Sequence, residues 1–314
     1  MKDITCISLK TMSPVPFPQE SVLCLGNFDG VHVAHRQLMQ RALDLRKMRY
    51  PDAACGVFCF HTPSWEYLLS PAPSYLTTLE EKLELFAECG VEYVFLADFP
   101  SVRQLSPEDF VQRILIEKCH CISAVCGYNY RFGAYGKGDP ALLSRLLKST
   151  VITQGEVRDE DGTVSSTRIR RLLSAGDVEA VTRLLTHPYT LTSPVIHGKG
   201  LGKTWGIPTI NQEFPAKKQI PCKGVYVTSC MIDGVCYEAI SNVGTRPTVE
   251  QDSNINCETY LLNFNGNLYG NVISTSFLKF IRQEMRFDSE QELTMQIQAD
   301  IAVAREYFEK NDTQ

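Results

Sequence analysis

The chain has 314 residues, which is long for one compact domain and short for three, so we expect two domains. Hydrophobic residues make up 44% of the sequence and charged residues 21%. These values are typical of globular proteins and exclude an intrinsically disordered chain. The 31 Lys and Arg against 36 Asp and Glu give a formal net charge of −5, which argues against a nucleic-acid partner.

The twelve cysteines form no Cys-x-x-Cys pair, and most lie in apolar runs such as residues 54–60. We therefore expect free, buried thiols and a reducing, cytoplasmic location. The first 26 residues carry three prolines and one short apolar stretch, which excludes a signal peptide. No segment approaches the roughly 18 apolar residues that span a bilayer, so we expect no membrane partner.

Short apolar runs alternate with amphipathic helical patterns in the first part of the chain, which predicts an α/β domain with a parallel sheet. A capping box formed by Thr78 and Glu81 predicts a helix that ends at Gly90. Further helices are predicted from about residue 106, over 166–176, and from 177 to about 185. The predicted strands are residues 22–25, 54–60, 93–96, 124–126 and 151–153.

After about residue 186, the sequence changes to strand patterns in which apolar and polar residues alternate, without helical patterns between them. Strands predicted over 225–231 and 235–240 flank Asp233-Gly234, and a third over 258–264 precedes Asn265-Gly266, two signals for β-hairpins. The pattern predicts a small antiparallel barrel or sandwich, followed by a long helix that begins at Ser289 and packs on it. We expect a first domain over 1–185 and a second over 186–314.

Residues 26–35 (GNFDGVHVAH) connect a predicted strand to a helix through a glycine-bearing turn, which is the geometry of a phosphate site. His32 and His35 are expected on one helix face, where both could donate hydrogen bonds to a triphosphate. The alternatives are a structural pair of histidines or two ligands of an incomplete metal site.

Two further strings, residues 127–133 (GYNYRFG) and 165–170 (SSTRIR), follow strands or begin a helix. Their hydroxyl and guanidinium groups would complete a phosphate cradle. Each string alone could be a helix cap or a solvated loop. Together with residues 26–35 they resemble a nucleotidyltransferase.

The second part carries its own polar strings. Thr209 and Asn211 end residues 202–211 (GKTWGIPTIN) and offer neutral oxygens suited to Mg²⁺ and phosphates, although a polar loop would look the same. Glu258 begins an apolar stretch, and a carboxylate there is often only an edge charge. The remaining strings are residues 184–189, 195–198, 224–226, 242–248 and 282–287.

With residues 76–82 (LTTLEEK), these strings make the chain resemble the bacterial bifunctional riboflavin kinase and FMN adenylyltransferase family, also called FAD synthetases, from about residue 22 to 308. The resemblance implies a Rossmann-like nucleotidyltransferase domain followed by a small antiparallel β-barrel with a terminal helix. It implies phosphorylation of riboflavin to FMN and adenylylation of FMN to FAD, with ATP as co-substrate and Mg²⁺ as cofactor. Self-association stays open.

The resemblance also implies roles for individual residues. In the first domain His32 and His35 would act on the phosphates and Asn129 would lie near the flavin phosphate. In the second, Glu258 would accept the proton of the ribityl hydroxyl, Thr209 and Asn211 would bind the metal, and Arg282 and Phe287 would contact the flavin. The implied ATP and phosphate ligands are Gly26, Phe28, Asp29, Gly30, Ser165, Ser166, Thr167, Arg168, Gly202 and Lys203.

Two departures from the family pattern lie in the first domain. Ala34 stands where the family usually has glycine between the histidines, and its methyl group could crowd the phosphate. The family's Phe-x-x-His-Pro after the second strand is absent, since Phe60 is followed by His61-Thr62-Pro63. The alternatives are therefore a riboflavin kinase with a degenerate adenylyltransferase domain, and a non-catalytic flavin-binding regulator.

Overall fold

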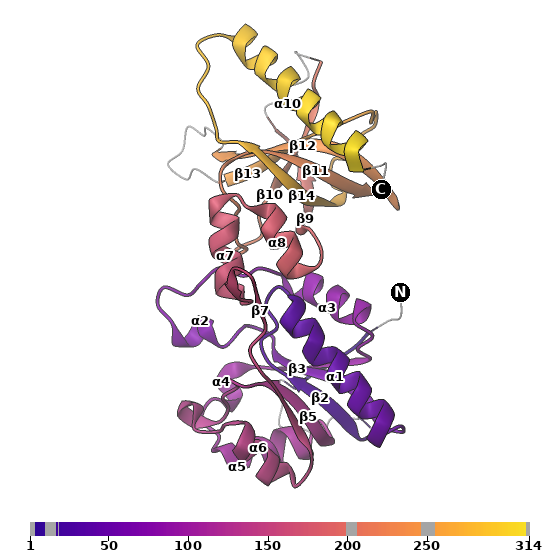
Figure 1. The fold of residues 1–314 in the computed structure, drawn as a ribbon, viewed down its shortest axis with the longest axis vertical. Coiled ribbons are helices and arrows are strands. Elements are labelled where there is room, and N and C mark those ends of the chain that lie inside the picture. Colours follow the sequence, from indigo (N-terminus) through magenta and orange to yellow (C-terminus); the bar gives the residue numbers. More distant parts are fainter. Residues whose placement is uncertain (1–3, 10–16, 18, 199–205, 246–254, 312–314) are drawn as a thin grey trace. The chain divides into compact units, whose positions relative to one another are not determined.

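The structure, a computed structural model, describes residues 4–9, 17, 19–198, 206–245 and 255–311. The chain divides into two compact units, Met1–Ser166 and Thr167–Gln314 (Figure 1). This division lies earlier than the expected boundary after residue 185. The helices α7 (Ser166–Ala175) and α8 (Val178–Leu185) account for the difference, because α8 contacts two strands of the second unit.

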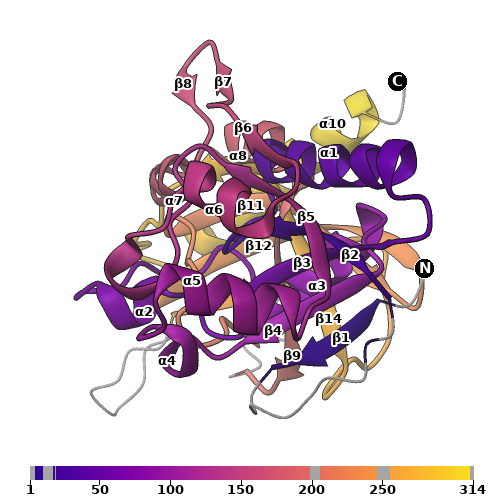
Figure 2. The same ribbon diagram turned by 90° about the horizontal axis from the view of Figure 1, so that it is seen from below.

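The first unit is built on a six-stranded parallel sheet with the order β1-β4-β3-β2-β5-β6. The five predicted strands are confirmed, and β1 is an additional strand. Its four residues, TCIS, are mostly exposed and form no continuous apolar run, and the strand lies at the sheet edge beside β4 (Figure 2). The strands are β1 (Thr5–Ser8), β2 (Ser21–Leu25), β3 (Ala54–Phe60), β4 (Tyr93–Ala97), β5 (Cys121–Gly127) and β6 (Val151–Gln154).

Helices cover both faces of this sheet, so its central strands are buried on both sides. In β2, Leu23 and Leu25 join one hydrophobic core, and Val22 and Cys24 join the other. The α1 and α3 helices pack on the second core, and η1 and α6 pack on the first. The helices are α1 (Val33–Arg49), α2 (Trp65–Leu68), α3 (Leu79–Glu88), α4 (Phe99–Val102), α5 (Pro107–Asp109), η1 (Phe110–Ile116), η2 (Ala134–Gly136) and α6 (Pro140–Leu147).

The helix caps follow the sequence signals closely. Thr78 and Glu81 form the expected reciprocal capping box at the start of α3, and Gly90 follows its end with φ +80°. Ser106 caps α5, but after one turn the chain continues as the π-helix η1. A widened helical turn keeps the apolar side chains on nearly the same face, so hydrophobic spacing alone does not reveal it.

The second unit is a closed antiparallel barrel with the order β10-β13-β12-β11-β14-β9, which settles the choice between barrel and sandwich. Its interior contains hydroxyl groups that bond to one another, as Ser241 does with Thr228 and Thr259 at 2.7 Å each. The strands are β9 (Tyr189–Ile196), β10 (Thr209–Glu213), β11 (Gly224–Ile232), β12 (Val235–Thr245), β13 (Ile255–Leu261) and β14 (Val272–Arg282). The small β7 (Arg158–Asp159) and β8 (Gly162–Thr163) form a separate hairpin in the first unit.

The long helix α10 (Glu290–Asn311) packs on the outside of this barrel, as expected. Its Ile301 and Ala304 are buried against Val227 and Ile240. The hairpin at Asp233-Gly234 is also confirmed, because it joins β11 to β12 with positive φ at both turn residues. The hairpin predicted at Asn265-Gly266 was wrong, because β13 and β14 are not neighbours in the barrel.

The strand predicted over residues 258–264 has different bounds in the structure. It starts at Ile255 and ends at Leu261, so Glu258 occupies the middle of β13 and the prediction that it begins the strand was wrong. Residues 255–257 follow a segment whose sequence has no clear alternation of apolar and polar residues, so the start of β13 was not detected. A carboxylate in a central strand has fixed neighbours on both sides.

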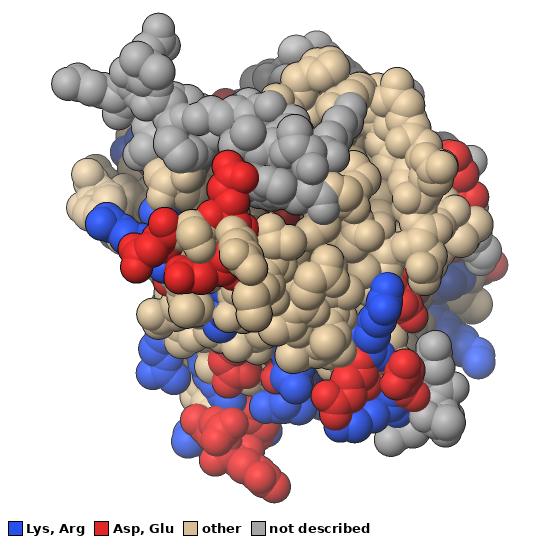
Figure 3. Space-filling view, turned by 90° about the horizontal axis from the view of Figure 1, so that it is seen from above, with Lys and Arg blue, Asp and Glu red and all other residues tan. Residues whose placement is uncertain are grey.

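The surface and the thiols agree with the composition. All twelve cysteines are free, and eight of them are buried. No helix in the described part of the chain is long and apolar enough to cross a membrane. On the face shown in Figure 3, acidic and basic side chains are interspersed, and uncharged side chains occupy the centre.

Candidate active sites

The turn between β2 and α1 adopts an unusual backbone conformation. Phe28, Gly30 and Val31 have φ values of +52°, +82° and +41°. Glycine adopts such values freely, whereas the left-handed region costs about 1 kcal/mol or more for other residues, and more for a β-branched side chain. Phe28 and Val31 are fully buried, so packing and hydrogen bonds must hold the turn in place.

Asp29 supports this turn from within. Its carboxylate is 2% exposed, and Oδ1 accepts hydrogen bonds from the backbone N–H groups of Leu76 at 2.9 Å and Thr77 at 3.3 Å. Thr77 Oγ1 in turn accepts from Gly30 N at 3.1 Å. These contacts give Asp29 a supporting role in the turn, and the phosphate contact that the resemblance implied stays a prediction.

His32 and His35 lie together at the start of α1, as expected. Their rings stack with centroids 3.6 Å apart and planes at 15°, and the ring of Phe28 meets His35 edge-on at 5.3 Å. Nδ1 of each histidine is enclosed, and neither has a hydrogen-bond partner among the residues that the structure describes. Unpaired buried imidazole nitrogens next to a helix N-terminus indicate a binding site for a polar ligand.

Burial makes both imidazoles neutral at physiological pH. It lowers the pKa of His32 to about 4. The pKa of His35 is well below its usual value because of burial, and the positive charges of a protonated His32 and of Lys82 lower it further. A phosphate bound at this pair would therefore meet neutral N–H donors, and positive charge would have to come from elsewhere.

This neutrality has a consequence for stability. An unfolded histidine takes up a proton near pH 6.5, whereas folded His32 does so only near pH 4. Stability is therefore complete above pH 6.5 and is lost as the pH falls toward 4, by at most about 1.4 kcal/mol per pH unit for each such histidine.

We expect the unfolding free energy of His32→Asn to fall less steeply than that of the unmodified protein when the pH is lowered from 6.5 to 5, a range in which few carboxylates titrate. Denaturant titration at several pH values measures this slope. An unchanged slope would contradict the assignment of a neutral, buried His32. His61→Asn, which replaces an exposed histidine of the same unit, serves as the matched control.

The other predicted residues of the first site lie after the carboxyl ends of strands or at the start of α7. Gly26 follows β2 and Asn129 follows β5, and these two strands are parallel neighbours. Ser166 Oγ donates to the backbone oxygen of Asp29 at 2.9 Å. Ser165 is half-buried, and Thr167 and Arg168 occupy the first turn of α7, the latter with a buried side chain.

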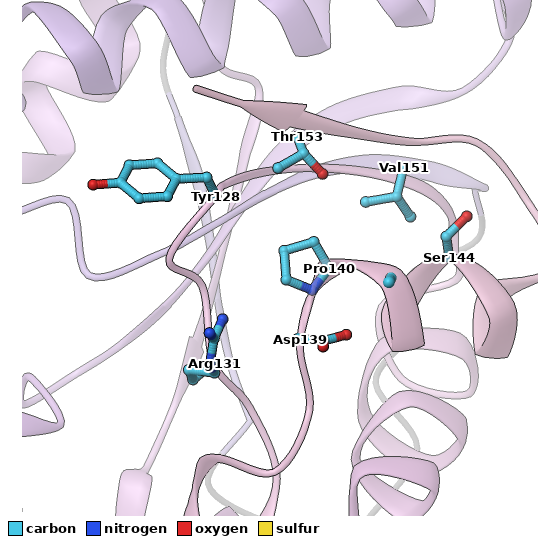
Figure 4. A pocket seen from close by; sticks show the side chains of 8 residues that line it. Tyr128, Arg131, Asp139, Pro140, Ser144, Val151 and Thr153 are labelled. Carbon is cyan, nitrogen blue, oxygen red and sulfur yellow. The ribbon is translucent and has the colours of Figure 1, made fainter. Parts of the chain in front are cut away.

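A pocket of about 470 Å³ opens beside β5, β6 and α6 (Figure 4). Its polar groups include Tyr128 and Arg131 from the predicted 127–133 string, and Asp139, which caps α6. Sequence reasoning missed the contributions of α6 and β6. The lining residues are Tyr128, Arg131, Asp139, Pro140, Ala141, Ser144, Val151 and Thr153.

The second site is a polar patch on the outer face of the barrel. Glu258 on β13 lies directly opposite Asn211 on β10 and Asn242 on β12. Facing partners in a ladder point to the same side of a sheet, and the alternate residues Gln212 and Cys257 are fully buried. Three adjacent strands thus present two amides and one carboxylate together.

Asn211 is held in place by its neighbours. Its side chain is buried, and Oδ1 accepts a hydrogen bond from Asn256 Nδ2 at 2.9 Å. A Cβ at Gly198 would displace the Asn211 amide. Thr209 lies two residues earlier on the same strand and therefore on the same face. The second lone pair of the Asn211 oxygen and the Thr209 hydroxyl suit a hard cation.

Sequence reasoning missed two residues of this patch, Asn256 and Glu284. A Cβ at Gly244 would lie 2.2 Å from Glu284 Oε1 and 3.0 Å from Asn242 Nδ2, so Glu284 reaches the same face as Glu258. Glu284 follows the end of β14, and only its contact with the residues around Gly244 on β12 reveals its place in the patch. Gly202 and Lys203 lie outside the described residues.

Arg282 is engaged in an ion pair between β14 and α10. Its Nη2 lies 2.7 Å from Asp300 Oδ2, and Nε donates to both carboxylate oxygens of the almost fully buried Asp300. The Phe287 ring lies 5.9 Å from the guanidinium carbon. The structure thus brings the two predicted flavin residues together, and their contact with flavin stays a prediction.

Comparison with known proteins agrees with the two sites. The FAD synthetase family model matches residues 15–168, and the riboflavin kinase family model matches residues 185–308. Bifunctional riboflavin kinase/FMN adenylyltransferases of *Escherichia coli* and *Bacillus subtilis* are 35% and 32% identical to this chain. The alignments cover 93% and 92% of this chain, and 94% and 93% of those proteins.

A solved structure from *Streptococcus pneumoniae*, described as a macrolide-efflux protein, is 30% identical to the chain. It superposes with a TM-score of 0.88 and covers 96% of this chain and 99% of its own. The two family models together span most of the sequence, in the order of the two units. The chain belongs to the family of bifunctional riboflavin kinase/FMN adenylyltransferases.

Proposed function

We propose that the chain phosphorylates riboflavin to FMN in its second unit and adenylylates FMN to FAD in its first, with ATP as the co-substrate of both steps. The observation that carries this proposal is the presence of a polar site of the appropriate kind in each unit. The family membership and the names of the relatives support it.

In the first unit, an oxygen of the FMN phosphate attacks the α-phosphorus of ATP in line, and pyrophosphate leaves. The reaction needs positioning and stabilisation of charge, without a covalent enzyme intermediate. His32, His35 and the N-terminal N–H groups of α1 donate hydrogen bonds to the phosphates. Asn129 lies near the flavin phosphate.

Further residues are proposed to form the nucleotide site of the first unit. Gly26, Phe28 and Gly30 form the turn. The hydroxyl groups of Ser165 and Ser166 bind the triphosphate. Thr167 and Arg168 belong to the second unit, so the resemblance alone assigns them to these phosphates.

In the second unit, the ribityl 5′-hydroxyl attacks the γ-phosphorus of ATP, ADP leaves, and Glu258 accepts the proton of the hydroxyl. A carboxylate is a weak base in water, but the loose transition state of phosphoryl transfer demands little of the base if it is well placed. The central position of Glu258 in β13, with paired strands on both sides, supports this role. Arg282 and Phe287 contact the flavin, and Gly202 and Lys203 bind ATP phosphate.

ATP-dependent transferases of both kinds generally need a divalent metal, and we propose Mg²⁺. Thr209 and Asn211 would hold it in the second unit, where their neutral oxygens leave several positions for water and ATP phosphates. When bound, the metal would neutralise charge on the transferred phosphoryl group. The free cysteines support a reducing, cytoplasmic location.

One assay tests this function. The protein is incubated with ATP and Mg²⁺, and with either riboflavin or FMN, and the flavins are separated by chromatography. We expect FMN and FAD from riboflavin, and FAD from FMN. FMN without FAD would leave a kinase whose first unit is degenerate, as Ala34 would allow, and no product from either flavin would leave a non-catalytic flavin-binding protein.

A further inference from the structure

The segment 76–82 contacts the turn of residues 27–30 between β2 and α1, which we call the phosphate turn. Two of its backbone N–H groups bind Asp29, and Thr77 Oγ1 accepts from Gly30 N. Lys82, on α3, adds a fourth contact, because Nζ donates to the backbone oxygen of Asn27 at 3.1 Å. Three of the four turn residues 27–30 are thus hydrogen-bonded to this segment, and the fourth, Phe28, is held by packing.

Lys82 is unusual among these contacts because it is a buried charge. Its residue is 3% exposed, and no carboxylate lies within ion-pair distance of it among the described residues. A buried ammonium without a counter-ion is costly, and a single carbonyl oxygen offsets that cost only in part. Such a group gains stability when an anion binds nearby.

The surroundings indicate which anion this is. Asn27 belongs to the turn that precedes the stacked histidines, and Lys82 lies close enough to His35 to act on it electrostatically. Both histidines are neutral, so they supply hydrogen bonds without positive charge. A buried cation behind them supplies the charge that a triphosphate requires.

We propose that Lys82 is a positioning residue for adenylyl transfer: it fixes the carbonyl of Asn27, and so the left-handed turn, and its ammonium supplies the positive charge that stabilises the bound triphosphate. The inference rests on the proposed function of the first unit. It explains why a turn with two strained residues other than glycine is kept in place by a lysine and not by a neutral donor.

Two variants separate the hydrogen bond from the charge. Lys82→Gln keeps a donor for the Asn27 carbonyl, whereas Lys82→Met keeps only the volume. We expect both to lower kcat for FAD formation, by about tenfold for Gln and about a hundredfold for Met, because small displacements of reacting groups cost that much. The KM for ATP rises in both, and FMN formation in the second unit stays unchanged.

Lys118→Met is the matched control, because Lys118 is also a buried lysine of the first unit but lies before β5, away from the phosphate turn. It leaves FAD formation unchanged. Equal losses in Lys82→Met and Lys118→Met would overturn the proposal, as would FAD formation by Lys82→Met within twofold of the unmodified protein.

A spectroscopic measurement separates positioning from a general loss of structure. NMR titration of the ring nitrogens should show that the pKa of His35 rises in Lys82→Met and does not change in Lys118→Met. An unchanged His35 titration in Lys82→Met would contradict the electrostatic contribution. If the unmodified protein formed no FAD, the proposed function itself would fail, whereas FAD formation unaffected by Lys82→Met would remove only the role of Lys82.

Discussion

Replacing Glu258 with Gln is expected to lower FMN formation from riboflavin by about 10²- to 10⁴-fold, the usual contribution of a positioned base. Glutamine has nearly the same shape, so β13 keeps its pairing with β10 and β12. It cannot accept the proton of the attacking hydroxyl. Conversion of supplied FMN to FAD stays unchanged, because that step takes place in the first unit.

The comparison needs a control from the same barrel. Glu238→Gln removes a carboxylate from β12 at a position opposite Ser229, away from the patch around Glu258, and is expected to leave both activities intact. The rate of each flavin's appearance, followed by chromatography, measures the effect. FMN formation by Glu258→Gln at close to the unmodified rate would remove Glu258 from the mechanism.

Replacing His32 and His35 together with Ala is expected to lower FAD formation by about 10³-fold or more and to leave FMN formation unchanged. Removing one preorganised donor from a developing negative charge costs about 10² to 10³ in rate. The two rings stack on each other, so their effects are not independent and the double variant gives the clearest result.

His61→Ala serves as the control for this pair. His61 follows β3 near the place where the family has its His-Pro, and it is exposed. We expect no loss of FAD formation. A loss as large as that of the double variant would mean that His61 replaces the missing histidine, and unchanged FAD output from the double variant would exclude the phosphate role of the stacked pair.

Local signals predicted the framework of both units well. The strands of the first sheet are continuous apolar runs, and Thr78 with Glu81 caps α3 through contacts three residues apart. The strand β1 and the π-helix η1 escaped prediction. β1 depends on pairing with the distant strand β4, and η1 depends on a widened helical turn. The spacing of hydrophobic residues reveals neither feature.

The sites were predictable only where a motif is continuous in sequence. The histidine pair lies within one helical turn, so its spacing was sufficient to place the two rings together. Asn256 and Glu284 reach the second site through strand register and a distant segment. The inward position of Asp29 and the burial of Lys82 depend on contacts with segments about 50 residues away, which no local pattern encodes.

The central claim is that the two units break different bonds of ATP, and isotopic labelling tests it most directly. The protein is given riboflavin with ATP labelled at either the γ- or the α-phosphorus, and FMN and FAD are separated. The account predicts γ-label in FMN, and both γ- and α-label in FAD. FAD without α-label, or flavins without any label, would contradict it.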